Sequence, residues 1–304
     1  SYIGREHEGG PRSRGNQWLL IGPWLHGRSN KAPKVGDIEY PENASWPVDA
    51  HMLKWFDHWL KGIDNGVTKE PKVRSYVMGP TGEPGAPGNV WREADDWPPH
   101  AEMRPLFLHQ EGSLNWDSPT EDDSSTSFVS DPRHPMEIPG TSFPGAKDAR
   151  PFESQAEVRT FTTEPLPEPM EWTGRIQAEL FLSSTARDTD VIIRVSDVYP
   201  DGRSILIVDY PWCLRYRNGF DHEELMEPGT VYPVKFPVGW LSQVFGKGHR
   251  IRVTIASTGA PLYEPNPQNG KPFTLEFPDD ATVATNTVHH SKSHASRILA
   301  PIAK

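Results

Sequence analysis

The sequence is poor in cysteine, in positive charge and in long hydrophobic runs. Cys213 is the single cysteine of 304 residues, which excludes an intrachain disulfide. Lysine and arginine number 31 against 41 aspartate and glutamate residues, giving a formal net charge of −10. This balance repels nucleic acid and anionic membranes, so we expect neither as a partner. No apolar run approaches the ~20 residues that a membrane-spanning helix needs.

Proline and glycine, in contrast, are plentiful, with 32 and 25 residues. They fit short strands joined by turns. Residues 18–24 (WLLIGPW) form a continuous apolar run of strand length, which predicts a strand of a parallel sheet buried on both faces. The run ends in Leu25 and His26, at the C-terminal end of the strand. Open α/β sheets place their chemistry at that end.

A helix is predicted next, between Ser45 and Gly62. Ser45 can cap it, Pro47 suits its first turn and Gly62 follows as a stop. A strand follows at residues 73–78, so the first region resembles the last piece of an α/β sheet. The apolar face of the helix comprises Val48, Met52, Trp55, Phe56, Trp59 and Leu60.

After residue 97 short alternating runs with turns between them replace this pattern. Within residues 176–182, Ile176, Ala178, Leu180 and Leu182 alternate with residues that face the other way, which predicts a sheet with one buried face. The fold class expected is therefore mainly β. Residues 98–304 are predicted to form an antiparallel β-sandwich, a jelly roll, preceded over residues 1–97 by the last piece of an α/β sheet.

His26 is the candidate for chemistry. In α/β-hydrolases the triad histidine lies on a loop after the last strands, behind the serine and the acid in the chain. A lone histidine on a loop is more often a solvated bystander, so the pattern alone leaves both readings open. Residues 140–145 match G-x-S-x-x-G, but Pro144 and the absence of a strand before Ser142 favour a turn in a linker.

His289, His290 and His294 have a spacing that could bind a metal. No cysteine or acidic ligand stands nearby to complete a tetrahedral set, so we predict a solvated strand end and no metal or cofactor. The basic residues of the C-terminal region are dispersed among acids, and we interpret them as charges at strand edges. They are Arg215, Arg217, Lys247, Arg250 and Arg252.

Several segments resemble the CocE/NonD serine hydrolases, a family of cocaine esterases, α-amino-acid ester hydrolases and X-Pro dipeptidyl-peptidases. Residues 19–27 look like the family's GPW-x-H histidine motif, and residues 55–67 look like its WFDHWLKG-x-DNGV helix. Residues 73–79 match the strand that closes its α/β domain. The resemblance thus implies that residues 1–97 are the C-terminal remnant of an α/β-hydrolase domain. Segments resembling its C-terminal domain are residues 131–135, 188–190, 197–202, 215–217, 248–252, 266–267 and 286–290.

The resemblance implies a serine hydrolase that acts on esters or amides through an acyl-enzyme. By motif His26 corresponds to the triad base. The family's serine, acid and cap precede this histidine and are expected to be missing here, so the chain alone is expected to be inactive. The implied partners are that N-terminal hydrolase segment and a small ester or peptide substrate.

Two further expectations concern surfaces. Because the strands beside residues 19–24 are missing, we expect exposed apolar surface there, and the chain could form a homo-oligomer that covers it. The alternative function is a non-catalytic jelly-roll module that binds a carbohydrate or a protein. Exposed tryptophans would support it; Trp91, Trp97 and Trp116 are candidates, although packing between the domains is the preferred interpretation.

Overall fold

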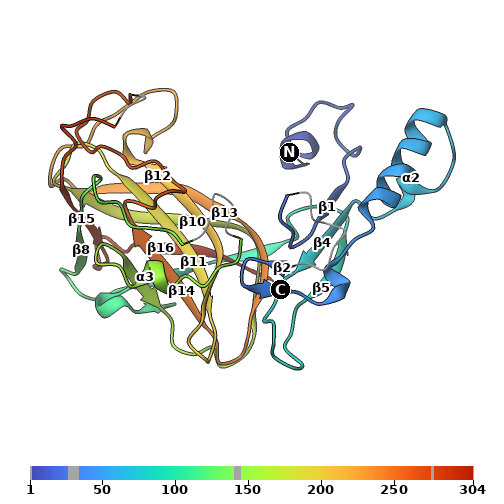
Figure 1. Cartoon of the computed structure of the whole chain (residues 1–304), viewed down its shortest axis with the longest axis horizontal. Coiled ribbons are helices and arrows are strands. Elements are labelled where there is room, and N and C mark those ends of the chain that lie inside the picture. Colours follow the sequence, from blue (N-terminus) through green and yellow to red (C-terminus); the bar gives the residue numbers. More distant parts are fainter. Residues whose placement is uncertain (1, 27–33, 140–144, 275–276, 304) are drawn as a thin grey trace.

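The computed structural model describes residues 2–26, 34–139, 145–274 and 277–303, and it is mainly β (Figure 1). Two sheets face each other and form a sandwich. One has seven strands, in the order β7-β6-β16-β10-β15-β8, with β13 also paired to β10. The strands of this sheet are β6 (Ala101–Leu108), β7 (Leu114–Asn115), β8 (Ser125–Ser130), β10 (Met170–Ser184), β13 (Tyr232–Phe245), β15 (Ala284–His289) and β16 (Arg297–Ala303).

The facing sheet has four antiparallel strands in the order β12-β11-β14-β9. Side chains from both sheets meet in one apolar core that contains Phe161, Trp172 and Phe245. The described strands thus confirm the predicted antiparallel sandwich, while the jelly-roll connectivity stays a prediction. The four strands are β9 (Arg159–Thr162), β11 (Asp190–Val198), β12 (Ser204–Cys213) and β14 (Arg250–Ala256).

The alternation predicted for residues 176–182 is present in β10. Ile176, Ala178, Leu180 and Leu182 are all at most 5% exposed. On the opposite face Glu179 accepts hydrogen bonds from side chains of the flanking strands β13 and β16. Period-2 patterning therefore decided which face of this strand enters the core.

The second region holds a three-stranded sheet in which β1 (Leu19–Ile21) is parallel to β4 (Val73–Val77), and β5 (Val90–Ala94) is antiparallel to β4. The helix α2 (Val48–Lys61) lies beside this sheet and projects away from the sandwich (Figure 1). The remaining elements are α1 (Tyr2–Glu6), β2 (Lys34–Val35), β3 (Ile38–Glu39), α3 (Arg150–Glu153) and the 3-10 helices Glu42–Ala44, Val67–Lys69, Gln110–Gly112 and Leu214–Tyr216.

The limits of α2 agree with the prediction at its C-terminus, where Gly62 adopts a left-handed φ of 72°. At the other end Pro47, and not Ser45, holds the N-cap position. The sandwich does not cover the apolar face of α2. No residue of Val48–Lys61 is buried, because the helix extends beyond the reach of the sandwich; Phe56 is 47% and Trp59 is 52% exposed.

The strand predicted over residues 18–24 is shorter and less buried than expected. Only Leu19–Ile21 is extended into a strand, and Ile21 is 42% exposed. Among the described residues β1 pairs on one edge alone, with β4, so the other edge has no strand to cover it. This exposed edge is the apolar surface that we expected beside residues 19–24.

The two regions touch through β4 and the sandwich. The Met78 N–H donates to the Ser242 carbonyl at 2.9 Å, and the Val244 N–H donates to the Met78 carbonyl at 2.8 Å. A small apolar cluster containing Tyr76 and Tyr199 packs across the same junction. The chain leaves the three-stranded sheet after Ala94 and enters the seven-stranded sheet at Ala101. The division at residue 97 itself stays a prediction.

Candidate functional site

His26 lies on an exposed turn that follows β1. The parallel pairing of Leu19 with Val73 and Ile21 with Ser75 holds β1 on β4, and the chain then leaves the C-terminal end of the strand. This is the end at which parallel sheets place functional loops. The turn of His26 therefore lies where a catalytic loop would lie, and His26 itself is exposed to solvent.

Trp24 anchors this turn. Its indole N–H donates to the Ala44 carbonyl at 2.7 Å, and its ring lies 5.7 Å from the ring of Trp91. Gly22 makes this arrangement possible, because a Cβ there would lie 2.5 Å from the Trp24 ring. The residues before His26 are therefore held in one conformation by packing.

A cavity of about 450 Å³ lies between this turn and the sandwich. Trp24 and Leu25 line one side and β12 lines the other, through residues 206–209. Tyr40 and Tyr263 complete much of the wall. Leu25 lines the cavity, and His26 is the next residue in the chain. The mostly apolar lining suits a small organic group with few polar atoms.

Asp209 is the carboxylate of this cavity. Burial raises its pKa and the guanidinium of Arg194 opposes that rise, with 3.9 Å between Arg194 Nε and Asp209 Oδ2. The net pKa of Asp209 lies above its ordinary value. Arg194 is itself 2% exposed and stacks over the ring of Phe152 at 4.5 Å. The cavity thus has one partly compensated charged pair in an otherwise apolar wall.

No described residue makes a hydrogen bond to the His26 ring, so nothing in that part of the chain plays the role of the acid behind a catalytic base. The serine of the G-x-S-x-x-G motif, Ser142, lies outside the described residues, as do positions 140–144 in general. Gly145 is described, at the edge of the cavity. The structure therefore brings His26 together with a cavity and with no described nucleophile or acid.

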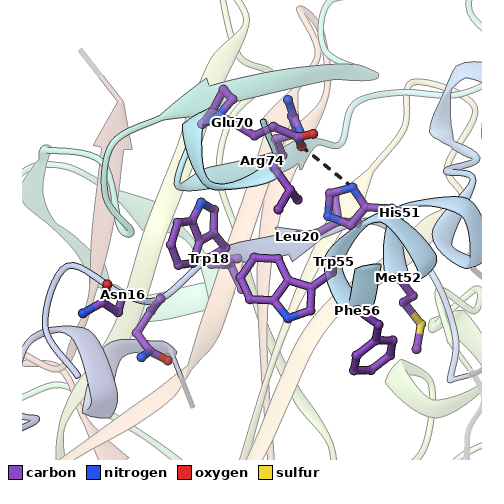
Figure 2. Close-up of a pocket in the computed structure, with 13 residues that line it drawn as sticks. Asn16, Trp18, Leu20, His51, Met52, Trp55, Phe56, Glu70 and Arg74 are labelled. Atoms are coloured by element: carbon purple, nitrogen blue, oxygen red, sulfur yellow. Dashed lines mark hydrogen bonds and ion pairs between the residues drawn. The ribbon is translucent and has the colours of Figure 1, made fainter. Parts of the chain in front are cut away.

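A second hollow, of about 270 Å³, lies between β1 and α2 (Figure 2). Trp18 and Trp55 form its apolar part, with ring centroids 5.1 Å apart. Its polar part is centred on Glu70, which accepts a hydrogen bond from Arg74 at 2.6 Å and from Lys54. Burial raises the pKa of Glu70, but the two bonded cations outweigh it and the pKa lies below its ordinary value. An ionised and fully paired Glu70 fits a structural role.

The C-terminal histidines do not form a metal site within the described residues. His290 was expected to be solvated, and this was wrong: it is 0% exposed. Its two ring nitrogens contact the hydroxyls of Ser124 and Thr126, both at 2.9 Å, because β15 lies inside the seven-stranded sheet beside β8. Burial lowers its pKa. His290 is a satisfied core histidine.

Two of the basic residues interpreted as strand-edge charges, Arg215 and Arg217, are buried instead. Arg215 is 1% exposed, and its Nε donates to Asp188 Oδ2 at 2.7 Å, a carboxylate with 0% exposure. Asn266 donates to the same Asp188 oxygen at 2.8 Å and to Asp190 Oδ1 at 2.8 Å. Spacing could not reveal this network, because its members lie far apart in the sequence. It ties the 266–271 segment to the sandwich.

The candidate tryptophans of the binding-module alternative pack against the protein. Trp97 is 4% exposed. Trp91 packs on the rings of Trp24, Trp46 and Tyr76, and Trp116 packs against the sandwich core. They form no shared exposed platform in the part of the chain that is described. Among the described helices, none is long and apolar enough to cross a membrane.

Comparison with known proteins gives consistent results. A family model described as the X-Pro dipeptidyl-peptidase C-terminal non-catalytic domain matches residues 65–299. A cocaine esterase of Rhodococcus sp. (strain MB1 Bresler) is 33% identical over 94% of this chain and 51% of its own length. A putative serine esterase of Mycobacterium bovis is 27% identical over 93% of this chain and 45% of its own length. The chain thus spans about half the length of these relatives.

Solved structures share the fold. An aminopeptidase from a marine sediment archaeon (Thaumarchaeota) superposes with a TM-score of 0.84 at 27% identity, over 99% of this chain and 51% of that one. An α-amino-acid ester hydrolase gives a TM-score of 0.81 at 24% identity, over 94% of this chain and 50% of that one. The chain therefore belongs to the X-Pro dipeptidyl-peptidase C-terminal non-catalytic domain family, the C-terminal part of CocE/NonD-type serine hydrolases.

Proposed function

We propose that this chain is the C-terminal portion of a serine hydrolase acting on esters or amides, of the acyl esterase or X-Pro dipeptidyl-peptidase type. In this proposal His26 is the general base of the triad. The serine nucleophile and the carboxylic acid come from the half of the relatives' length that this chain does not span.

The observation that carries the proposal is the position of His26. It follows a parallel strand, on a turn anchored by Trp24, and the residue before it, Leu25, lines a cavity of about 450 Å³. A base in acyl transfer must reach the nucleophile's hydroxyl from a fixed position while its other ring nitrogen is held by a carboxylate. The anchored turn supplies the fixed position. No residue in the described part of the chain bonds to the exposed His26 ring, so the hydrolase half could bring its partners.

The proposal has a second part: the hydrolase half docks beside β1 and α2. The exposed apolar surface of these two elements supports it. The open edge of β1 offers unpaired backbone groups, and α2 exposes Leu53 at 59% and Leu60 at 78%. Apolar surface of this extent next to an open strand edge is typical of an interface. In this proposal the preceding strands of the α/β sheet pair with β1, and further helices cover α2.

A hydrolysis assay tests the proposal. We expect the chain alone to hydrolyse neither a short-chain p-nitrophenyl ester nor an X-Pro p-nitroanilide. Fusion behind the preceding half of the Rhodococcus cocaine esterase is expected to give turnover. In that fusion His26→Gln should lower kcat by at least about 10³-fold, because the serine loses its base.

The matched control is His222→Gln, which changes another exposed histidine, one that contacts the neighbouring Asp221. It should leave kcat unchanged in the fusion. Undiminished turnover in the His26→Gln fusion would refute the role of His26. Turnover by the chain alone that a fluorophosphonate abolishes would show a nucleophile within these residues and would overturn the division of the triad.

A further inference from the structure

A buried histidine of the sandwich is held between two carboxylates from different parts of the molecule. His249 is 0% exposed. Its Nδ1 lies 2.7 Å from Asp197 Oδ1, on β11, and its Nε2 lies 3.2 Å from both oxygens of Glu83. Glu83 belongs to residues 78–89, the loop that joins β4 to β5, which we call the β4–β5 loop. One imidazole therefore connects the sandwich to the three-stranded sheet.

A second contact of the same loop lies next to this one. The N–H of Thr81 donates to the hydroxyl of Tyr199 at 3.1 Å, and the ring of Tyr199 lies 4.4 Å from the ring of His249. Tyr199 also belongs to the apolar cluster between the two regions. The β4–β5 loop thus contacts His249 and Tyr199. The strength of this contact depends on which hydrogen bonds those two side chains can donate and accept.

The number of protons on His249 decides whether both carboxylates can be satisfied. A protonated imidazole donates from Nδ1 to Asp197 and from Nε2 to Glu83. A neutral imidazole has one N–H. If that N–H points at Asp197, the lone pair of Nε2 faces the ionised Glu83, and the contact with the loop turns from attractive to repulsive.

The other polar and charged groups near His249 interact with partners other than its ring. Asp197 accepts from Gln243 at 3.4 Å on its other oxygen. Arg203 stacks over Tyr199 at 4.3 Å, and Lys247, in the turn before His249, pairs with Glu168 on the surface. Two carboxylates therefore face His249 directly, against one stacked guanidinium behind Tyr199.

The pKa directions agree with this geometry. Burial lowers the pKa of His249, but Asp197 and Glu83 outweigh it, so the pKa lies above its ordinary value of 6.5. Burial also raises the pKa of Tyr199, so its hydroxyl stays protonated over the same range. Since the folded state binds the His249 proton more strongly than the unfolded chain, the stabilisation is complete below pH ~6.5 and is lost as pH rises through the folded-state pKa.

We propose that His249 is a proton-dependent latch that holds the β4–β5 loop on the sandwich when doubly protonated and releases it when neutral. The loop continues directly from β4, and β4 carries β1 and the turn of His26. Release therefore loosens the contact between the sandwich and the strand pair that positions His26.

Hydrogen exchange at the Thr81 amide tests the latch, because that N–H donates to Tyr199 inside the loop contact. The exchange rate is measured from pH 6 to pH 10 by NMR and corrected for the intrinsic rate, while the ring signals of His249 report its titration. We expect protection of Thr81 to fall roughly tenfold as His249 loses its proton, the effect of losing one charge-assisted hydrogen bond. The amide of Val253, within β14, serves as the reference and should not change.

Glu83→Gln is the decisive variant. An amide can donate to the bare Nε2 of a neutral histidine and accept from a protonated one, so this change should keep the loop docked and remove the pH dependence. Glu83 is 36% exposed on its side chain, which makes the substitution compatible with folding. Glu168→Gln, which removes the nearby surface pair with Lys247, is the matched control and should retain the wild-type pH response.

Two results would overturn the latch. One is protection of Thr81 that does not change while the His249 ring titrates. The other is the same loss of protection in Glu83→Gln as in the wild type, which would assign the pH response to another group.

Discussion

The sandwich and the three-stranded sheet with α2 differ in how much of their apolar surface is covered. The sandwich encloses a core in which Phe161, Phe245 and Ile193 have no exposed surface. The helix α2 also carries large apolar side chains, spaced so that they share one face, yet none of its residues is buried. Both regions obey their sequence periodicity, so the difference lies in what surrounds them.

This difference indicates which region is structurally complete. Paired sheets cover each other, so the sandwich satisfies its own apolar faces. The three-stranded sheet has β1 at one end, with no described strand beyond it, and one helix that touches it at Trp18. Its exposed surface lies beside the turn of His26, where we propose that the hydrolase half docks.

The largest expected effect is a difference in unfolding free energy between two phenylalanine substitutions. Phe245→Ala removes a fully buried ring of the sandwich that packs on Trp172, and we expect it to lower the free energy of unfolding by about 3–5 kcal/mol. Phe56→Ala removes a ring that is 47% exposed on α2, and we expect a change within about 0.5 kcal/mol. Urea unfolding measures both. Equal losses would mean that α2 is packed as tightly as the sandwich.

An intermediate effect should come from the polar network of the sandwich. Loss of solvent around Asp190 raises its pKa from 3.8 to about 7. The folded state therefore binds a proton that the unfolded chain releases near pH 4, and this stabilisation is lost as pH rises through 7. Asp190→Asn removes that loss, so it should be more stable than the wild type at pH 8 by at most about 4 kcal/mol and of similar stability at pH 4.

Urea unfolding at pH 4, 6 and 8 checks this expectation. Asp122→Asn, at an exposed position, is the control and should follow the wild-type stability at every pH. A wild-type chain and an Asp190→Asn chain that lose stability in parallel between pH 4 and 8 would assign the pH dependence to other groups.

The smallest effect on stability should accompany a clear effect on association. Trp59→Ser and Leu60→Ser together remove large exposed side chains of α2, and we expect a change within about 0.5 kcal/mol in unfolding free energy. If copies of the chain associate through α2, light scattering should show a lower mean mass for this double variant. Val129→Ser, which is equally exposed on β8 of the sandwich, should leave the mass unchanged. An unchanged mass in the double variant would exclude α2 as the contact.

Much of the secondary structure could be predicted because the signals are local. A period-2 run indicated β10, and Gly62 marked the end of α2. Within residues 117–150, a stretch rich in serine, aspartate and proline, Ser125–Ser130 forms β8, with Phe128 buried. Its partner strand, β15, lies far along the chain, and no local pattern announces such a pairing.

The sequence by itself determined the chain's periodicities and the motif around His26. Alternation and helical spacing depend on neighbours a few residues apart, and these decide which face of an element is apolar. Only the tertiary structure decided which charges are buried and with whom. Arg215 pairs with Asp188, and His249 contacts Asp197 and Glu83, because strands and loops that are distant in the sequence lie side by side in the fold. A charged side chain is buried only where such a partner compensates its loss of solvent. For His26 the motif predicted the role, and the fold added an anchored turn beside a cavity.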